Sequence, residues 1–245
     1  MMNLFSFVYP QFKFGKTINV IECFSGIGTQ AMALKRLAKK HDLEINITAI
    51  SEIDKYAIQS YEAIHGKVNN LGGIGSFDRF PSGVDLCTWS FPCQDISLAG
   101  KQKGMKDGTR SNYGYEFLDT VKRTPYNERP KVLLMENVPA LVSEKFKDDY
   151  TEIHYRLEQL GYTSWGGLMN AKDYGIPQNR ERIFVLSFLG EYVYTFPRPI
   201  KLKTRLLDYL EDEVDEKYFI SDKMIKYISQ PGTKNYKADT KINLE

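Results

Sequence analysis

The chain has 245 residues, 42% of them hydrophobic, and its 33 basic and 31 acidic side chains give a formal net charge of +2. This length and apolar content suffice for one large α/β domain or two small ones. The near-balanced charge excludes a broad basic surface, so a nucleic-acid partner has to be inferred from a specific site.

The cysteine pattern and the absence of targeting signals indicate the compartment. The three cysteines form no C-x-x-C pair and the three histidines are scattered, which argues against a disulfide framework and a metal site. The aromatic N-terminus lacks the basic region and the cleavage site of a secretion signal, and no segment approaches a membrane span. We therefore expect a cytoplasmic protein with no membrane partner.

Four apolar, β-rich runs each lead into a stretch with apolar residues at helical spacing. The runs cover 18–24, 45–52, 83–90 and 131–138. This alternation predicts an α/β fold, a doubly wound and mostly parallel sheet with crossover helices on both faces. In that architecture ligands bind at the carboxyl ends of the strands.

The pattern changes after Gly161 to two hairpin-like segments, "YTSWGGLMN" and "RIFVLSF", and from about Thr195 the sequence becomes rich in proline and charge. We expect one domain over residues 1–195 and a linker over residues 196–245.

The turn "FSGIG" follows the first run, and its Gly26 and Gly28 allow a ligand to approach the backbone closely. Glu52 ends the second run, about where a nucleotide-binding sheet presents an acid to ribose hydroxyls. Thr29 replaces the glycine that cradles a pyrophosphate, which favours a ligand other than NAD. A tight turn and a solvated glutamate explain these features equally well.

Cys93 follows the third run in "SFPCQDIS". Pro92 restricts the backbone there and sets the direction of the next side chain, which suits a positioned nucleophile. A lone cysteine is more often a small buried hydrophobe, and we expect that role for Cys23 and Cys87.

Charged side chains complete the same edge of the sheet. Glu136 ends the fourth run, so Glu52, Cys93 and Glu136 emerge together. In "PQNRER", Arg180 and Arg182 lie on the same side of an extended segment, suited to holding an anion or a base carbonyl. Helix capping or an ion pair would explain Glu136 taken singly, and a structural ion pair would explain either arginine.

Together and in this order, these stretches resemble the motifs of the C5-cytosine DNA methyltransferases, which use S-adenosylmethionine. The similar segments are "ECFSGIG", "SEIDKYAIQSY", "SFPCQDIS", "GMKDGTRSNYGYEF", "ENV" and "DYGIPQNRERIF". The resemblance runs from about residue 18 to residue 188. It implies a Rossmann-like methyltransferase fold over residues 1–195.

The resemblance implies roles for the residues at the sheet edge. The target cytosine would be flipped out of double-stranded DNA, and Cys93 would attack its C6 atom. Glu136 would hydrogen-bond or protonate the N3 side, Arg182 would hold the base carbonyl, and Arg180 would hold the neighbouring acid or backbone. Asn137 would support the Pro92–Cys93 loop from behind.

The resemblance also implies a binding site for S-adenosylmethionine, which leaves as S-adenosylhomocysteine. The cofactor-binding residues would be Phe24, Ser25, Gly26, Gly28, Thr29, Glu52, Ile53, Ile74 and Pro92, with Gln94 beside Asn137 behind the site. The family usually has an aspartate before Ile74 that binds the adenine amino group. Gly73 stands there in this chain, and Asp78 is a weak substitute.

Members of the family continue into a target-recognition domain, which we expect to lie outside this sequence, so residues 196–245 would lead toward it. We expect a missing C-terminal region or a second chain to supply target recognition, and weak or absent sequence-specific methylation by this chain alone. The expected setting is restriction-modification or phage DNA protection. Alternatives are an RNA (tRNA) cytosine C5 methyltransferase, a catalytically incomplete subunit that needs a partner chain, a binding module without chemistry, and, more distantly, a dinucleotide-dependent oxidoreductase.

Overall fold

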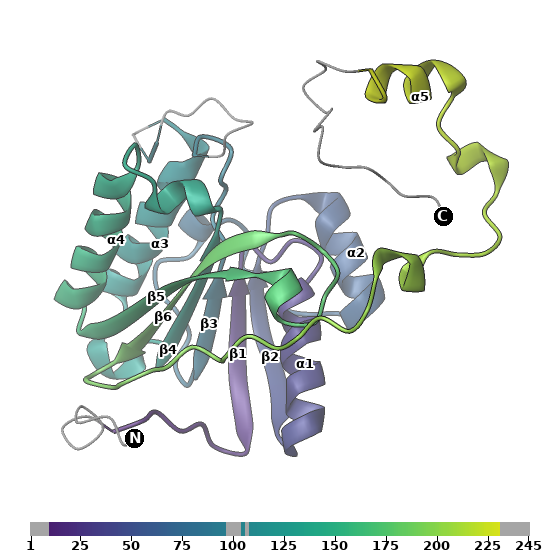
Figure 1. Cartoon of the computed structure of the whole chain (residues 1–245). Helices are drawn as coiled ribbons and strands as arrows, with labels where there is room; N and C mark the ends of the chain where they lie inside the picture. Colours follow the sequence, from purple (N-terminus) through teal and green to yellow (C-terminus); the bar gives the residue numbers. More distant parts are fainter. Residues whose placement is uncertain (1–9, 97–103, 106–107, 231–245) are drawn as a thin grey trace. The chain divides into compact units, whose positions relative to one another are not determined.

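The structure, a computed structural model, describes residues 10–96, 104–105 and 108–230 (Figure 1). The strands are β1 Thr17–Cys23, β2 Glu44–Ser51, β3 Leu86–Trp89, β4 Val132–Asn137, β5 Tyr162–Asn170 and β6 Glu181–Leu189. The α-helices are α1 Thr29–His41, α2 Lys55–His65, α3 Tyr113–Arg123, α4 Lys147–Gln159 and α5 Asp222–Ile228. The chain divides into two compact units, residues 1–203 and 204–245.

The six strands form one sheet in the order β2-β1-β3-β4-β6-β5. The first four are parallel, whereas β6 runs antiparallel to β4 and to β5. After α2 the chain forms a parallel bridge between Asn70 and Ile50 on β2 and then returns to β3. The helices α1 and α2 lie on one face of the sheet, and α3 and α4 lie on the other (Figure 1). This follows from right-handed crossovers, because the chain adds strands on one side of β1 through α1 and α2 and on the other side through α3 and α4. The predicted doubly wound α/β sheet is confirmed.

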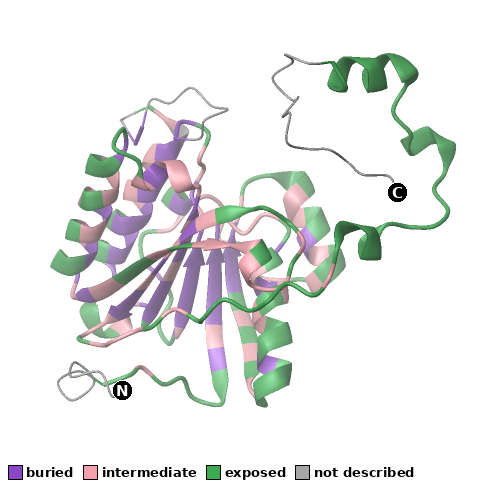
Figure 2. Ribbon diagram, in the orientation of Figure 1, coloured by how far each residue is buried: buried purple, intermediate pink, exposed green. Residues whose placement is uncertain are grey.

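The centre of the sheet is buried on both faces (Figure 2). All four residues of β3 are buried, as expected for a strand that is covered on both sides. Trp89, which ends β3, stacks on Phe117 of α3 with 4.2 Å between ring centroids and 8° between ring planes. This packing fixes the end of β3, from which the "SFPCQ" loop departs.

The predicted hairpin after Gly161 is also present. β5 and β6 pair from Tyr162 opposite Leu189 to Asn170 opposite Glu181. The Asn170 side chain closes the connection, because its amide nitrogen donates to Asn179 Oδ1 at 2.8 Å and its Oδ1 accepts from the backbone of Arg180 at 3.1 Å. These bonds fix the start of β6 beside the end of β5.

The first unit extends to Lys203, and Ile200 is tied to it because its backbone N–H donates to Asp173 O at 2.8 Å. The expected division after residue 195 stays a prediction. In the second unit, every residue described from 205 to 230 is exposed, including α5. No helix in the described part of the chain is both long enough and apolar enough to cross a membrane.

Candidate active site

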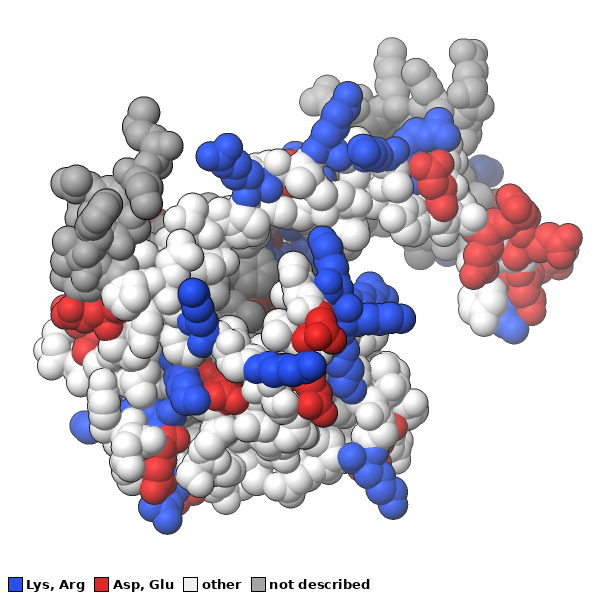
Figure 3. Space-filling view, turned by 90° about the horizontal axis from the view of Figure 1, so that it is seen from below, with Lys and Arg blue, Asp and Glu red and all other residues white. Residues whose placement is uncertain are grey.

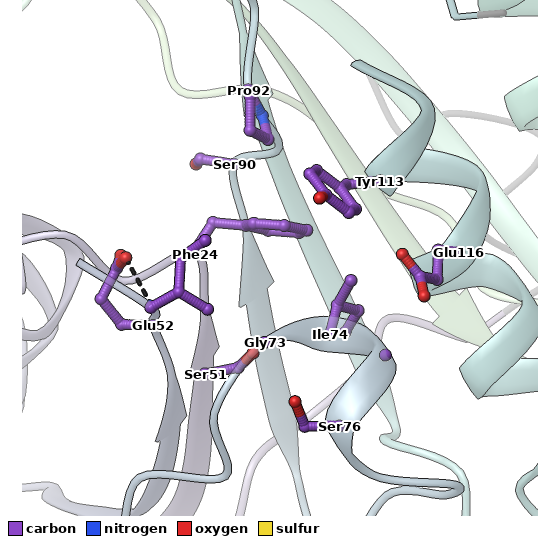
Figure 4. Close-up of a pocket in the computed structure, with 12 residues that line it drawn as sticks. Phe24, Ser51, Glu52, Gly73, Ile74, Ser76, Ser90, Pro92, Tyr113 and Glu116 are labelled. Carbon is purple, nitrogen blue, oxygen red and sulfur yellow. Dashed lines mark hydrogen bonds between the residues drawn. The ribbon is translucent and has the colours of Figure 1, made fainter. Parts of the chain in front are cut away.

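A pocket of about 460 Å³ opens at the carboxyl ends of β1, β2 and β3 (Figure 4). Here the chain, having added β2 on one side of β1, adds β3 on the other side. This is the position at which doubly wound sheets bind their ligands. Five of the nine predicted cofactor-binding residues line it: Phe24, Glu52, Ile53, Ile74 and Pro92.

Phe24 lies at the centre of this pocket in an unusual backbone conformation. Its φ of 57° is in the left-handed region, which is costly for an aromatic residue. The hydrogen bond from its N–H to Ser51 O, 2.8 Å long, holds it there. The turn directs the ring into the pocket (Figure 4).

Glu52 lies at the rim of the pocket with its carboxylate fixed by backbone donors. Oε2 accepts from Gly26 N–H at 2.8 Å, and Oε1 accepts from Ile53 and Asp54 N–H at 2.8 and 2.9 Å. Charge-assisted bonds of this kind are about twice as strong as neutral ones. They join the end of β2 to the turn that follows β1.

Glu22 is a buried acid beneath the same turn. Its Oε1 accepts from Ala31 N–H at 2.8 Å, and its Oε2 accepts from the Tyr61 hydroxyl at 2.6 Å. Burial raises the pKa of the Glu22 carboxyl, against the effect of both hydrogen bonds. Glu22 thereby links β1 to the start of α1 and to the C-terminal half of α2, around the predicted cofactor turn.

Cys93 lies half-buried in the loop that follows β3, directly after Pro92 of the pocket. Hydrogen bonds between described residues hold this loop. Ser111 Oγ donates to Pro92 O at 2.7 Å, Asn137 Nδ2 donates to Phe91 O at 3.2 Å, and Ile96 N–H donates to Cys93 O at 3.0 Å. Cys23 and Cys87 are buried, with their sulfurs 3.8 Å apart.

Glu136, at the end of β4, forms an ion pair with Arg182 of β6, in which Arg182 Nε lies 3.0 Å from Oε1. Arg182 thus holds the acid in this structure. The roles expected for Arg182 at the base carbonyl and for Arg180 at the neighbouring acid or backbone stay predictions. Arg180 precedes β6 and is exposed, whereas Arg182 lies within the strand and faces β4. The strands β3, β4 and β6 are neighbours in the sheet. Cys93 follows β3, Glu136 lies near the end of β4, and Arg182 lies near the start of β6, so all three belong to one edge of the sheet.

The family model for C-5 cytosine-specific DNA methylases matches residues 18–244. The chain belongs to this family. It is 38% identical to the type II methyltransferase M.NlaX of Neisseria lactamica over 84% of this chain and 63% of that one. It is 32% identical to the type II methyltransferase M2.ScrFI of Lactococcus lactis subsp. cremoris over 85% of this chain and 71% of that one. The chain thus spans only part of both relatives.

Solved structures agree in fold. The methyltransferase EhMeth of Entamoeba histolytica superposes with a TM-score of 0.69 at 23% identity, over 87% of this chain and 67% of that one. At this identity the likeness establishes the architecture, a methyltransferase fold built on the same sheet.

The pocket of this C-5 cytosine methylase family member fits S-adenosylmethionine. Phe24, Ile53 and Ile74 offer apolar surfaces, and Glu52 offers a fixed acceptor at one side. The Ser25 hydroxyl in the adjoining turn is buried and has no hydrogen-bond partner within the described residues. Within the same residues, no cluster of three or more His, Cys, Asp or Glu side chains could hold a metal ion.

Four predicted cofactor residues, Ser25, Gly26, Gly28 and Thr29, do not line the pocket, and their binding role stays a prediction. Gly28 also has a packing role that the sequence did not indicate. A side chain there would overlap Tyr61 and His65 of α2, so the glycine allows α1 and α2 to pack.

The turn Gly73–Ile74–Gly75–Ser76 forms the floor of the pocket (Figure 4). Asp78, the suggested substitute for the missing aspartate, does not line it. Its side chain is 82% exposed and pairs with Arg123 at 3.1 Å, so this suggestion is wrong.

The sequence placed Gly73 at the adenine-binding position, and Gly73 lines the pocket. It did not identify six other pocket residues: Ser51, Gly75, Ser76, Ser90, Tyr113 and Glu116. Tyr113 and Glu116 lie three residues apart on α3 and so share a helix face. The spacing can be read from the sequence, but the sequence does not show that this helix face borders the pocket. Gln94 is exposed in the loop after Cys93, and its role stays a prediction.

Proposed function

We propose that this chain transfers a methyl group from S-adenosylmethionine to C5 of a cytosine in double-stranded DNA. The observation that carries the proposal is the placement of Cys93, Glu136 and Arg182 on one sheet edge beside a pocket that fits the cofactor. Membership of the family supports the same reaction.

Cytosine is unreactive at C5 until a nucleophile adds at C6. The Cys93 thiolate forms a bond to C6, and the electrons of the C5–C6 double bond shift toward C5 and the N3 side of the ring. Glu136 stabilises that charge through N3, while Arg182 fixes the orientation of Glu136 through their ion pair. When bound, S-adenosylmethionine supplies the methyl group that C5 accepts. Loss of the C5 proton then restores the double bond and releases Cys93.

The chemistry requires a flipped cytosine, because C6 cannot be reached within stacked DNA. The near-balanced charge of the chain, +2 overall, supplies little broad attraction for DNA. On the face seen from below in Figure 3, basic and acidic side chains are interspersed. Affinity for DNA must then come from local contacts and from target recognition.

We also propose that target recognition is supplied by a polypeptide segment outside residues 1–245, which covers the apolar side chains of the second unit. Leu207, Tyr218 and Phe219 are 66–70% exposed there, and large apolar side chains exposed together mark a binding surface. Co-expression with the polypeptide encoded directly downstream should raise methyl transfer, and Leu207→Ser combined with Phe219→Ser should reverse that gain. If co-expression with such a segment does not raise methyl transfer, the proposal that it supplies target recognition is wrong.

A covalent trap tests the reaction itself. With S-adenosylmethionine present, a pool of duplex DNA containing 5-fluorocytosine should form a denaturant-resistant adduct whose cross-linked peptide contains Cys93, because fluorine at C5 cannot leave as a proton. Cys93→Ala should abolish the adduct. Cys23→Ala is the matched control and should retain it.

A parallel pool of 5-fluorocytidine-substituted tRNA separates substrate classes. An adduct with tRNA and none with DNA would replace the proposed substrate by RNA. No adduct with either pool, from a chain supplied with its recognition segment, would refute the covalent mechanism.

A further inference from the structure

The pocket holds two carboxylates, and they differ in what they contact. Glu52 is bound by three backbone N–H groups. Glu116 of α3 lines the opposite side of the pocket, with Phe24 and Ile74 between the two acids (Figure 4). Across the described residues, the Glu116 side chain has no hydrogen-bond or ion-pair partner. It is therefore an acceptor available to a ligand.

Gly75 makes room for this carboxylate. A side chain at position 75 would overlap Oε1 of Glu116, with the next carboxyl atom at 3.2 Å. Gly75 does not have a positive φ, so its backbone conformation does not require glycine. The absence of a side chain instead lets Glu116 lie against the floor turn.

The position of Cys93 orients any methyl donor in the pocket. The reacting sulfonium must lie near Pro92, which precedes the nucleophile. Glu116 lies beside Ile74, away from Pro92 (Figure 4). The flat adenine ring then belongs at the end formed by Ile53, Ile74 and Glu116, where apolar side chains can cover its faces.

We propose that Glu116 accepts a hydrogen bond from the exocyclic amino group of the adenine and makes the pocket selective for adenine over other purines. The inference rests on the proposed function, since it assumes that S-adenosylmethionine occupies this pocket. An amino group at the ring edge needs an acceptor. Glu116 of α3 supplies this acceptor. The turn at the floor of the pocket has no side-chain acceptor before Ile74, because the residue there is Gly73.

Calorimetric binding of two ligands tests the role without relying on activity. The ligands are S-adenosylhomocysteine and its analogue in which purine, lacking the 6-amino group, replaces adenine. Glu116→Ala should weaken binding of S-adenosylhomocysteine by about 10-fold or more, the usual effect of losing a hydrogen bond to a charged group. It should leave binding of the purine analogue nearly unchanged. Gly75→Ala, which displaces the carboxylate, should give the same pattern.

Asp119→Asn is the matched control, because it removes an acid from α3 that pairs with Arg156 and does not line the pocket. It should bind both ligands like the wild type. Equal losses for both ligands, or no loss in a variant that melts like the wild type, would overturn the assignment to Glu116 and leave the proposed reaction intact. Failure of the wild-type chain to bind S-adenosylhomocysteine would overturn both.

Discussion

Arg182 Nε lies 3.0 Å from Glu136 Oε1, and the two side chains are only 22% and 23% exposed. Glu136 pairs with Phe184 across the β4–β6 ladder, so the two charged side chains share one face of adjacent strands. The ion pair holds the acid at the edge where Cys93 emerges. Arg180, two residues earlier, lies outside the strand.

The two arginines should therefore differ in their effect on catalysis. Arg182→Ala leaves a partly buried carboxylate without its partner, and we expect methyl transfer to fall by about 100-fold. Arg180→Ala removes an exposed side chain and should cause a much smaller loss. Single-turnover transfer of labelled methyl groups to DNA measures both, and binding of S-adenosylhomocysteine should be unchanged. Equal losses in the two variants would contradict the positioning role of Arg182.

Asn137 should act through the loop that carries Cys93. Asn137→Ala removes the donor to Phe91 O and the acceptor for Val138 N–H, which is 2.8 Å away, and leaves buried groups unpaired at a cost of about 1–3 kcal/mol. We expect lower stability in urea and a changed rate of Cys93 alkylation by iodoacetamide. Asn137→Asp keeps the acceptor and loses the donor, which isolates the bond to Phe91. Wild-type stability and alkylation rate in both variants would show that the loop does not depend on Asn137.

Gly28 and Gly26 should tolerate alanine differently. Both have positive φ, so alanine costs about 1–2 kcal/mol at either position. At Gly28 the new methyl group also overlaps Tyr61 and His65, which adds about 1–3 kcal/mol, whereas nothing lies within 4 Å at Gly26. Urea unfolding of the two variants measures the difference. Equal destabilisation would mean that α1 and α2 do not pack through Gly28.

Glu22 should make the stability depend on pH. Because burial raises its pKa above the ordinary 4.5, the folded chain holds this proton to higher pH than the unfolded chain does. The free energy of unfolding then falls as pH rises from 4.5 through the raised pKa. Glu22→Gln cannot ionise, so its stability relative to the wild type should increase across that range. A difference that stays constant from pH 4.5 to 8 in urea titrations would contradict this.

The sequence by itself determined the architecture and the candidate residues at the strand ends. Alternation of apolar runs with helical spacing predicts parallel strands joined by crossover helices, and the end of each run locates Glu52, Cys93 and Glu136 on one edge. These positions follow from local periodicity and connection rules, which are properties of contiguous sequence. The motif order then indicated the family.

The tertiary structure decided which side chains meet. The pairing of Arg182 rather than Arg180 with Glu136 depends on where β6 begins, and the entry of Glu116 into the pocket depends on how α3 packs on the turn before β3. The role of Gly28 depends on α2, which lies beside it only after folding. Contacts between segments far apart in the chain are set by packing. Local sequence patterns therefore do not reveal them.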